Sequence, residues 1–463
     1  MQNRQLTTLD IDGVRNRQGF PNGSDDAIIN LSIAPYYTAC PNPFIGEFLK
    51  EKGTVYDESS DKYHREPFTS DVSEGKNDAI YGSHNYHTKV PHKAIMRYIL
   101  HYTNPGDVVL DGFSGSGMTG VAAQMCGHPD SIFKMEIEQS MPSVQWGSRR
   151  AILNDLSLAA TFITCGQNSA VDGKWYEKNA NKLLSDSEDE YGWAYQTTHS
   201  ESMRDGQLSL NTGEKVGTIN YTVWSDVFIC PTCGKEIVFT EVQKSSENLK
   251  DAFVCPNCSR KLKKNECKRA KEILFDELLQ STVEIAKQIP VLINYTYAGK
   301  KYEKEPDEKD LEVIAKVREM TLPYDVPIIE LPDGCNTEQP RKSHGVEYMH
   351  HFYTKRNLYV ISVIYHNLAK YDNPDRQILT FTFEQILMGM SKIARYVPSH
   401  YSQVNQYLSG TLYIASQVVE VTPRYILENK IKHLTKVYSQ NVMTDGNVII
   451  STGSTTDLPV PND

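Results

Sequence analysis

The stretch VVLDGFSGSGMTGVAAQ, residues 108–124, joins an apolar run to a helix-forming run through a glycine-rich loop. The apolar run ends at Asp111, and Gly115, Gly117 and Gly120 follow it. A short buried strand, a loop of this kind and a helix form the repeating unit of α/β proteins with parallel sheets. The stretch therefore predicts an α/β fold with a ligand-binding loop at the carboxyl end of a strand.

The sequence on both sides continues this alternation. Apolar residues recur at helical spacing over residues 90–102, and Asn-Pro-Gly at 104–106 predicts a turn before the strand. Residues 149–163, RRAILNDLSLAATFI, are typical of a second strand followed by a helix. NVIISTGSTTDLP at 447–459 predicts a strand that returns to the same sheet. Together these segments predict a Rossmann-like parallel sheet.

Length and composition limit the class of protein. A chain of 463 residues with 39% apolar content is long enough for several domains and a large core. We divide it into an N-terminal extension (1–80), the α/β part (81–165), an inserted cysteine-containing domain (166–275), a mostly helical region (276–440) and the returning strand (441–463). We expect helical structure to begin at about residue 268 and to extend to 290.

The chain carries no sign of export or membrane insertion. No apolar run approaches the length of a membrane span, and the first thirty residues lack the features of a signal peptide. Nine cysteines are too few for a disulfide scaffold in a chain of this length. We expect a cytoplasmic protein in a reducing compartment, with no membrane partner. The net charge of -10 argues against a protein that coats nucleic acid through bulk charge but allows a local basic face.

The three glycines fit the GxGxxG spacing of dinucleotide-binding proteins, so a dehydrogenase is one alternative. In that fingerprint the first glycine follows the strand directly, whereas here Gly112, Phe113 and Ser114 intervene. A carboxylate and an aromatic ring at the strand end suit a ligand with a cationic amino-acid end, such as S-adenosylmethionine. A glycine-rich turn that only connects the strand to the helix is the other alternative.

The segment DGFSGSGMTG, residues 111–120, resembles the S-adenosylmethionine motif of amino-DNA methyltransferases, which methylate exocyclic amines of adenine or cytosine. YHTKVPHKAIMRYILHYTNPGD, residues 86–107, resembles the family's preceding motif, and RRAILNDLSLAATFI resembles its second strand. The resemblance implies a methyltransferase that uses S-adenosylmethionine and acts on double-stranded DNA. It implies that the cofactor contacts Thr88, Lys89, Asp111, Phe113, Ser114, Gly115, Gly117, Thr119 and Asp155.

The resemblance also implies that the acid after the second strand binds the cofactor ribose. Asp155 has this place, although 44 positions separate it from Asp111, about double the ~20 usual in such a unit. Glu136 is the second choice, and a helix N-cap is the alternative role for Asp155. Asp457 has the place of a polar residue near the cofactor adenine.

One family motif is missing from the chain. The family positions the target amine with Asp/Asn/Ser-Pro-Pro-Tyr/Phe, whereas none of the 22 prolines here follows another. We therefore identify no catalytic residue and expect a fragment or split subunit that needs a C-terminal segment or a partner subunit, which would also complete an unpaired sheet edge. Adenine N6 is favoured over cytosine N4. A non-catalytic DNA-recognition or regulatory subunit with this fold is the alternative.

Four cysteines form two pairs, CPTC at 230–233 and CPNC at 255–258. This spacing is typical of a zinc ribbon, in which Cys230, Cys233, Cys255 and Cys258 provide four thiolates to one Zn²⁺. Four protein ligands leave no coordination position for a catalytic water, so the predicted site is structural. A redox pair is the alternative, and Cys267 is a further candidate ligand.

Two basic segments are candidates for DNA contact. Seven Lys and Arg residues lie between Arg260 and Lys271, where they hold phosphates or form a solvated helix face. KIARYVPSHYSQVNQY, residues 392–407, combines cationic, aromatic and amide side chains, and its alternative role is local packing. Its candidate contact residues are Lys392, Arg395, Tyr396, His400, Tyr401 and Gln406.

Overall fold

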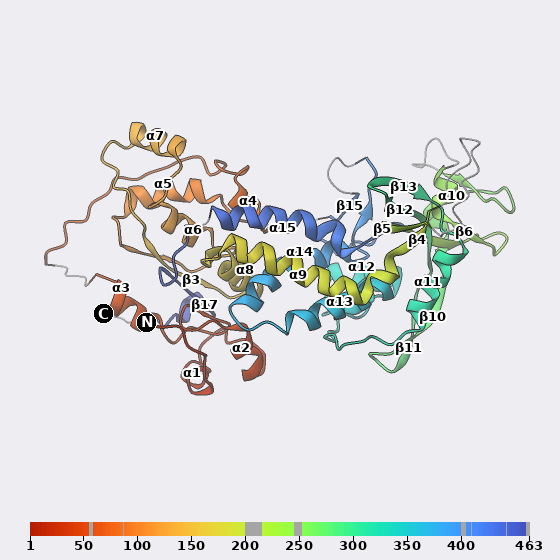
Figure 1. Cartoon of the computed structure of the whole chain (residues 1–463), viewed down its shortest axis with the longest axis horizontal. Coiled ribbons are helices and arrows are strands. Elements are labelled where there is room, and N and C mark those ends of the chain that lie inside the picture. Colours follow the sequence, from red (N-terminus) through yellow and green to blue (C-terminus); the bar gives the residue numbers. More distant parts are fainter. Residues whose placement is uncertain are drawn as a thin grey trace. The chain divides into compact units, whose positions relative to one another are not determined.

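The computed structural model describes residues 1–54, 59–86, 88–199, 215–244, 252–399, 404–408, 410–440 and 442–459 (Figure 1). The chain forms two compact units. The first unit comprises Met1–Ala180, Tyr371–Thr382 and Lys430–Asp463, and the second comprises Asn181–Lys370 and Phe383–Asn429. Residues 371–382 and 430–440 of the predicted helical region therefore lie in the first unit.

The first unit is built on a parallel sheet of four strands, as the sequence predicts. The strands are β2 (Val108–Asp111), β3 (Arg150–Asp155), β17 (Val448–Thr452) and β1 (Tyr37–Thr38), in the order β1-β17-β3-β2. All four run in the same direction, so their carboxyl ends meet at one edge of the sheet. The glycine loop after β2 lies at this edge.

The sheet ends at β2 on one side, with no partner strand among the described residues and with Leu110 55% exposed, so the expected unpaired edge is present there. On the other side β1 adds the N-terminal segment, where Tyr37 pairs with Ile450 and Thr38 with Ser451. The N-terminal segment is thus part of the sheet. A strand of two residues is too short for the periodicity of side chains to predict it.

Three helices of the first unit form where the sequence predicts them, namely α5 (His92–Tyr102), α6 (Met118–Met125) and α8 (Leu158–Asn168). A further helix, α7 (Ser131–Ser140), lies in a segment for which we predicted none. The side chain of Ser157 caps α8 by accepting from the backbone N–H of Ala160. The first unit also contains α1 (Thr8–Asp12), α2 (Asp25–Leu31), α3 (Ile45–Lys52), α4 (Ala79–Gly82) and the 3-10 turn η4 (Thr455–Asp457).

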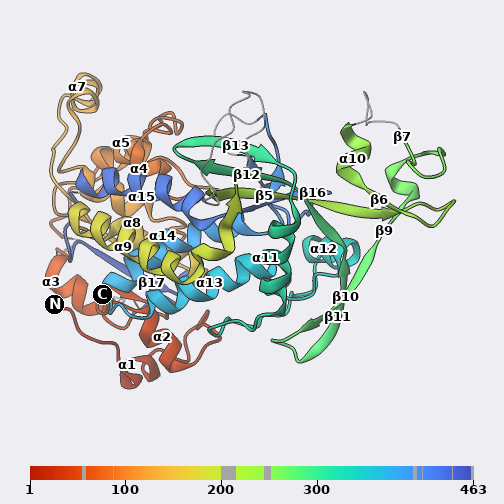
Figure 2. The same ribbon diagram turned by 45° about the vertical axis from the view of Figure 1, so that its right-hand side comes forward.

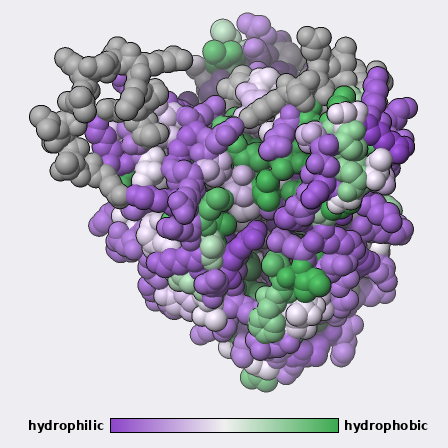
Figure 3. All heavy atoms as spheres, turned by 90° about the vertical axis from the view of Figure 1, so that its right-hand side faces the viewer, coloured by the Kyte–Doolittle hydropathy of each residue, from purple (hydrophilic) through white to green (hydrophobic). Residues whose placement is uncertain are grey.

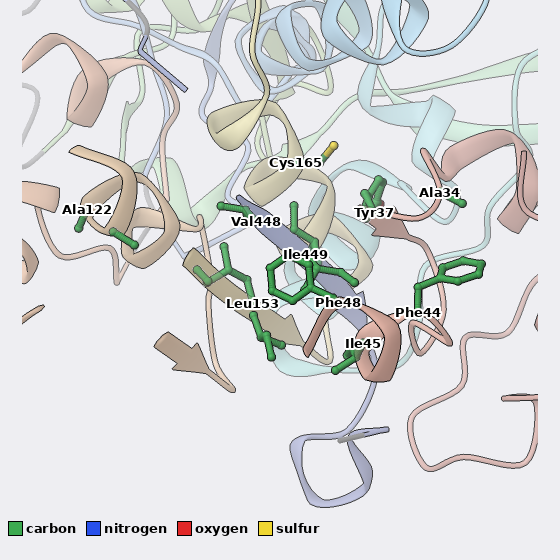
Figure 4. Packing of buried hydrophobic residues seen from close by; sticks show 14 of the residues in the cluster. Ala34, Tyr37, Phe44, Ile45, Phe48, Ala122, Leu153, Cys165, Val448 and Ile449 are labelled. Atoms are coloured by element: carbon green, nitrogen blue, oxygen red, sulfur yellow. The ribbon is translucent and has the colours of Figure 1, made fainter. Parts of the chain in front are cut away.

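The core of the first unit surrounds β3 and β17. Figure 4 shows Leu153 of β3 and Val448 and Ile449 of β17 close to Ile45 and Phe48 of α3. All five side chains belong to one buried apolar cluster. The N-terminal segment therefore contributes to the core as well as to the sheet.

The second unit is built on an antiparallel sheet of nine strands, which the sequence did not predict (Figure 2). Its longest strand, β5 (Val216–Ile229), pairs with five others. The nine strands are β4 (Gln196–Thr198), β5, β6 (Glu236–Val238), β9 (Lys268–Arg269), β12 (Gln288–Tyr297), β13 (Lys300–Lys304), β14 (Arg395–Tyr396), β15 (Asn405–Gln406) and β16 (Gln417–Val421).

The expectation of helix over residues 268–290 is wrong. This segment forms an antiparallel hairpin of β10 (Lys271–Asp276) and β11 (Ser281–Ala286), followed by β12. Exposed and partly buried residues alternate along β10, which is the period of a strand. Along β10 the apolar side chains of Ile273 and Phe275 are exposed, whereas Glu272 and Asp276 are partly buried, so charge does not mark the solvent face.

The remaining elements of the second unit are helical turns, helices and one short hairpin. They are η1 (Gly192–Tyr195), α10 (Phe239–Lys244), β7 (Phe253–Val254), β8 (Lys261–Leu262), η2 (Lys264–Glu266), α11 (Glu308–Glu319), α12 (Cys335–His344), η3 (Met349–Phe352) and α13 (Lys355–Leu368). Three helices, α9 (Gly173–Tyr191), α14 (Asp375–Met390) and α15 (Pro423–Ser439), contain residues of both units. Within the described residues, no helix has the length and apolar composition that crossing a bilayer requires.

Candidate cofactor site and metal centre

Asp111 fixes the start of the glycine loop. One of its carboxylate oxygens accepts from the backbone N–H of Phe113 at 3.0 Å, and the other accepts from Thr119 Oγ1 at 2.5 Å. The carboxylate therefore connects the end of β2 to the first turn of α6. Thr119, which we predicted as a cofactor contact, provides this connection by donating its hydroxyl hydrogen to Asp111.

Asp155 connects the second strand to the same loop. Its Oδ2 accepts from the backbone N–H of Gly115 at 2.9 Å, and its Oδ1 accepts from that of Ser157 at 2.9 Å. The N-cap of α8 is Ser157, so the alternative role of Asp155 as a helix N-cap is wrong. Glu136, the second choice for the ribose acid, lies on α7 near Arg97 rather than at the end of a strand.

The glycines of the loop are required by packing inside the protein. Gly115 and Gly117 have φ of +52° and +76°, in the left-handed region that favours glycine. A Cβ at Gly117 would lie 2.7 Å from Thr164 Cγ2 on α8, and one at Gly115 would lie 2.9 Å from the Tyr86 ring. Packing against the Tyr86 ring and Thr164 therefore requires glycine at these two positions.

Phe113 is the residue of the loop that remains free for a ligand. Its side chain is 83% exposed at the carboxyl end of β2, which is unusual for so large an apolar group at the base of a loop. Ser114 is buried, and its backbone N–H donates to the Asn154 carbonyl at 2.9 Å. Ser114 therefore fixes the loop, whereas Phe113 points away from the core.

The segment after β17 also contacts the glycine loop. From the sequence we predicted only Asp457 of this segment as a residue of the site. Thr455 Oγ1 donates to the Gly112 carbonyl, and Asn154 Nδ2 donates to the Gly453 carbonyl at 2.9 Å. Asp457, predicted near the cofactor adenine, pairs with Arg17 at 2.8 Å. The loops that follow β2 and β17 thus contact each other at the edge where Asp155 ends β3.

Thr88 and Lys89 have different environments. Thr88 is exposed, whereas Lys89 is partly buried and its Nζ donates to the carbonyls of Tyr81 and His84. Burial and then the charge of Lys430 lower the pKa of Lys89 to about 8. The Lys89 ammonium is therefore engaged by the α4 segment.

The four cysteines of the predicted ribbon come together in the second unit. Their Sγ atoms all lie within 4.8 Å of one another. Cys230 Sγ lies 3.8 Å from Cys258 Sγ, and Cys233 Sγ lies 3.9 Å from Cys255 Sγ. A tetrahedral site with Zn–S bonds of ~2.3 Å has sulfur–sulfur separations of ~3.8 Å. The sulfur geometry therefore fits one tetrahedral zinc ion.

The two cysteine pairs have the same backbone conformation. The N–H of Gly234 donates to the Cys230 carbonyl at 2.9 Å, and the N–H of Ser259 donates to the Cys255 carbonyl at 3.0 Å. Gly234 and Ser259 both have positive φ, +70° and +59°. Two matching turns of this kind are typical of zinc knuckles. Cys267 lies in the apolar core beneath them and outside the four-sulfur cluster.

A second group of metal-binding residue types occurs in the described residues, at Asp276, His350 and His351. Asp276 Oδ2 is 2.8 Å from His350 Nε2 and 2.9 Å from His351 Nε2. His351 Nδ1 accepts from the backbone N–H groups of Glu347 and Tyr348, so in the neutral ring Nε2 carries the hydrogen. Metal-bound histidines instead donate from their second nitrogen. The three side chains therefore form a hydrogen-bonded cluster that links β10 to η3.

The basic segment from Arg260 to Lys271 lies on the cysteine ribbon and the following strands, so the alternative of a helix face is wrong. Lys261, Lys263 and Lys268 are exposed, and none has a carboxylate within 4.0 Å among the described residues. The face in Figure 3 is mostly hydrophilic with separate hydrophobic patches. In the second basic segment, His400 and Tyr401 lie outside the described residues, and Lys392 lines a cavity of the second unit.

Comparison with known proteins gives one match. No curated protein and no solved structure matched the chain. Residues 42–140 match the family model described as DNA methylase, the N6/N4 methyltransferases. The matched segment contains α5, β2, the glycine loop and α6. This match supports an amino-DNA methyltransferase family for the part of the chain that carries the glycine loop.

Proposed function

We propose that this chain binds S-adenosylmethionine and recognises double-stranded DNA as part of an amino-DNA methyltransferase, with adenine N6 as the favoured acceptor. The observation that carries the proposal is the edge of the parallel sheet where Asp111 and the glycine loop, which lie in the segment that matches DNA methylases, meet Asp155. Ligands of open parallel sheets bind at the carboxyl ends of the strands.

The residues at this edge fit such a cofactor. The Asp111 carboxylate suits its cationic methionine end, and the exposed ring of Phe113 offers an apolar surface. Asp155 remains the proposed ribose acid, and binding the ribose would require its carboxylate to accept from ribose hydroxyls as well as from Gly115. When bound, the cofactor supplies the methyl group. The chain's own residues bind and orient it.

We further propose that methyl transfer needs a C-terminal segment or a partner subunit. Transfer requires the target base to be flipped out of the duplex and its amine to be placed in line with the methyl group. The family uses a Pro-Pro motif for this, and the sequence of 463 residues contains none. The isolated chain should therefore bind the cofactor and DNA without methylating it.

Calorimetric titration with S-adenosylmethionine and with NAD tests the binding site. We expect S-adenosylmethionine to bind and NAD to show no heat, and Phe113→Ala to weaken cofactor binding about 10-fold, or ~1.4 kcal/mol. Ile132→Ala is the control, because Ile132 is also exposed, at 66%, but lies on α7. Equal affinity of the wild-type chain and Phe113→Ala would contradict this placement.

A transfer assay tests the second part. The purified chain is incubated with radiolabelled cofactor and mixed-sequence duplex DNA, first alone and then with a polypeptide that carries the Pro-Pro motif. Label in DNA only in the second arm supports the proposal. Label in the first arm contradicts the need for a partner. Cofactor binding without label in either arm favours the non-catalytic recognition subunit.

A further inference from the structure

The second unit contains a cavity of about 460 Å³. Its walls come from the β10–β11 hairpin, α11, the start of α13 and the central strands β5 and β16. All the residues that line it belong to the second unit. The volume lies within the range of small-molecule sites, which is ~300–1,000 Å³. Neither the glycine loop nor the cysteine cluster contributes to this cavity.

Aromatic rings form part of the cavity wall. Trp224, Phe275 and Tyr353 all line it. The ring of Trp224 is fixed in orientation, because its Nε1 donates to buried Glu420 at 3.0 Å. The Arg318 guanidinium lies 5.9 Å from the centre of the same ring. The fixed Trp224 ring and the Arg318 guanidinium offer stacking surfaces for a planar ligand.

The charged residues of the cavity balance one another. Four cationic and four acidic side chains line it, so the wall is neutral overall. Three cations have carboxylate partners, as Lys355 pairs with Glu277, Arg356 with Glu420, and Arg318 lies 3.6 Å from Glu272. Lys392 and Glu319 are the two charged residues of the lining that remain. Because the four cations and the four carboxylates cancel, the wall favours a ligand without net charge.

Lys392 is the cation without a carboxylate partner. Among the described residues none offers a carboxylate within 4.0 Å of its Nζ, which donates to the His351 carbonyl at 3.0 Å. An ammonium has three donors, so two of them have no protein acceptor in the described part of the chain. Removal from water lowers the pKa of Lys392 to about 8. A ligand that accepts hydrogen bonds from the Lys392 ammonium would offset the free-energy cost of removing this ammonium from water.

We propose that this cavity binds a guanine base, stacked on the aromatic wall, with Lys392 donating to its O6 and N7 and a cavity carboxylate, Glu272, accepting from its amino group. Guanine is neutral and planar and has acceptors on one edge and donors on another. Adenine lacks the carbonyl oxygen. Thymine has the carbonyl oxygen but lacks the amino group.

Two sources can provide this base, a free guanine nucleoside or an extrahelical guanosine in DNA. In the first measurement, guanosine is titrated into the whole chain and binding is monitored by Trp fluorescence. In the second, the titrant is duplex DNA that has one bulged guanine. Matched ligands are adenosine and the same duplex with a bulged adenine. Neither titration needs the methyl donor, so the result is independent of the function proposed above.

We expect guanosine or the guanine bulge to bind at least about 10-fold more tightly than its adenine counterpart, a difference of ~1.4 kcal/mol. Lys392→Met should remove this preference, whereas Lys300→Met, an exposed lysine of β13 in the same unit, should keep it. Leu274→Trp, which fills the cavity, is the second variant if Lys392→Met fails to fold. Binding of guanosine itself identifies a nucleoside site, and binding of the bulge alone identifies a site for extrahelical DNA bases. Equal affinity for guanine and adenine, no binding of either, or unchanged preference in both variants would overturn the proposal.

Discussion

The metal centre gives the sharpest prediction. Replacing Cys233 by Ser removes one of four sulfurs whose separations of 3.8 and 3.9 Å match the edges of a zinc–thiolate tetrahedron. Structural zinc sites of this kind contribute ~10–16 kcal/mol of binding free energy at neutral pH. A quarter of that, ~2.5–4 kcal/mol, corresponds to an affinity about 100- to 1,000-fold lower. Wild-type protein should therefore keep one zinc per chain under conditions in which Cys233→Ser loses it.

The assay is metal content after dialysis against a chelator, measured by elemental analysis together with competition by a chromophoric chelator. Cys267→Ser is the matched control, because Cys267 lies in the same apolar core but outside the four-sulfur cluster. It should keep its zinc. The reasoning is refuted if the wild-type chain contains no zinc, or if Cys233→Ser keeps as much as the control.

Loss of zinc should also have a local structural effect. The apolar core of the ribbon contains few large side chains, among them Phe228, Phe253 and Leu262, so the metal provides much of its stability. Trypsin should then cleave at the exposed Lys261 and Lys263, while cofactor titration, which reports on the first unit, stays unchanged. Cleavage at the same rate with and without zinc would contradict a metal-dependent ribbon.

Three further predictions concern stability. Glu420→Ala should destabilise the second unit by ~3–5 kcal/mol in urea denaturation, because it leaves the buried Arg356 guanidinium without its carboxylate; a loss below about 1 kcal/mol would contradict this. Gly117→Ala should lower the melting temperature more than Gly299→Ala, since both have φ of +76° but only Gly117 would place its Cβ against a neighbour, Thr164; equal effects would show that backbone strain alone matters. Burial lowers the pKa of His344, so the unfolded chain takes up a proton first and stability should fall as the pH drops below about 6.5. His344→Asn should reduce the difference between urea midpoints at pH 7.5 and 5.5, and an unchanged difference would exclude this histidine as its cause.

The parts of the fold that the sequence predicts are those with a local signal. Strand β2, the glycine loop and α6 form one continuous segment whose pattern changes from apolar to glycine-rich to helical. The structure confirms the strand, the loop and the helix, although β2 is a partly exposed edge strand rather than the buried strand that we predicted. The cysteine pairs are equally local, because each knuckle is set by four or five residues. The sequence does not predict why Gly115 and Gly117 must be glycine, because the residues that they pack against, Tyr86 and Thr164, belong to distant segments.

The parts that sequence reasoning missed depend on pairing between distant segments. β1 is two residues long and is defined only by its partner β17, more than 400 positions away. The β10–β11 hairpin was expected as helix because its lysines and glutamates are common in helices, whereas cross-strand pairing decided its structure. The cavity around Trp224 combines residues from 224 to 420, so no window of sequence contains its pattern.

The ends of the cysteine ribbon have a consequence for protein engineering. The chain leaves β5 after Ile229 and returns at Lys268, and these two residues are direct partners in an antiparallel pair, as are Phe228 and Arg269. The intervening segment thus begins and ends on neighbouring strands, ~4.8 Å apart. Such a segment is a cassette: a two-residue turn such as Asn-Gly could replace it and close β5 and β9 into a plain hairpin. Strand β6, which pairs with β5, lies within the exchanged segment, so the turn variant would lose one of the nine strands, and a ribbon from another protein would have to supply a strand in its place.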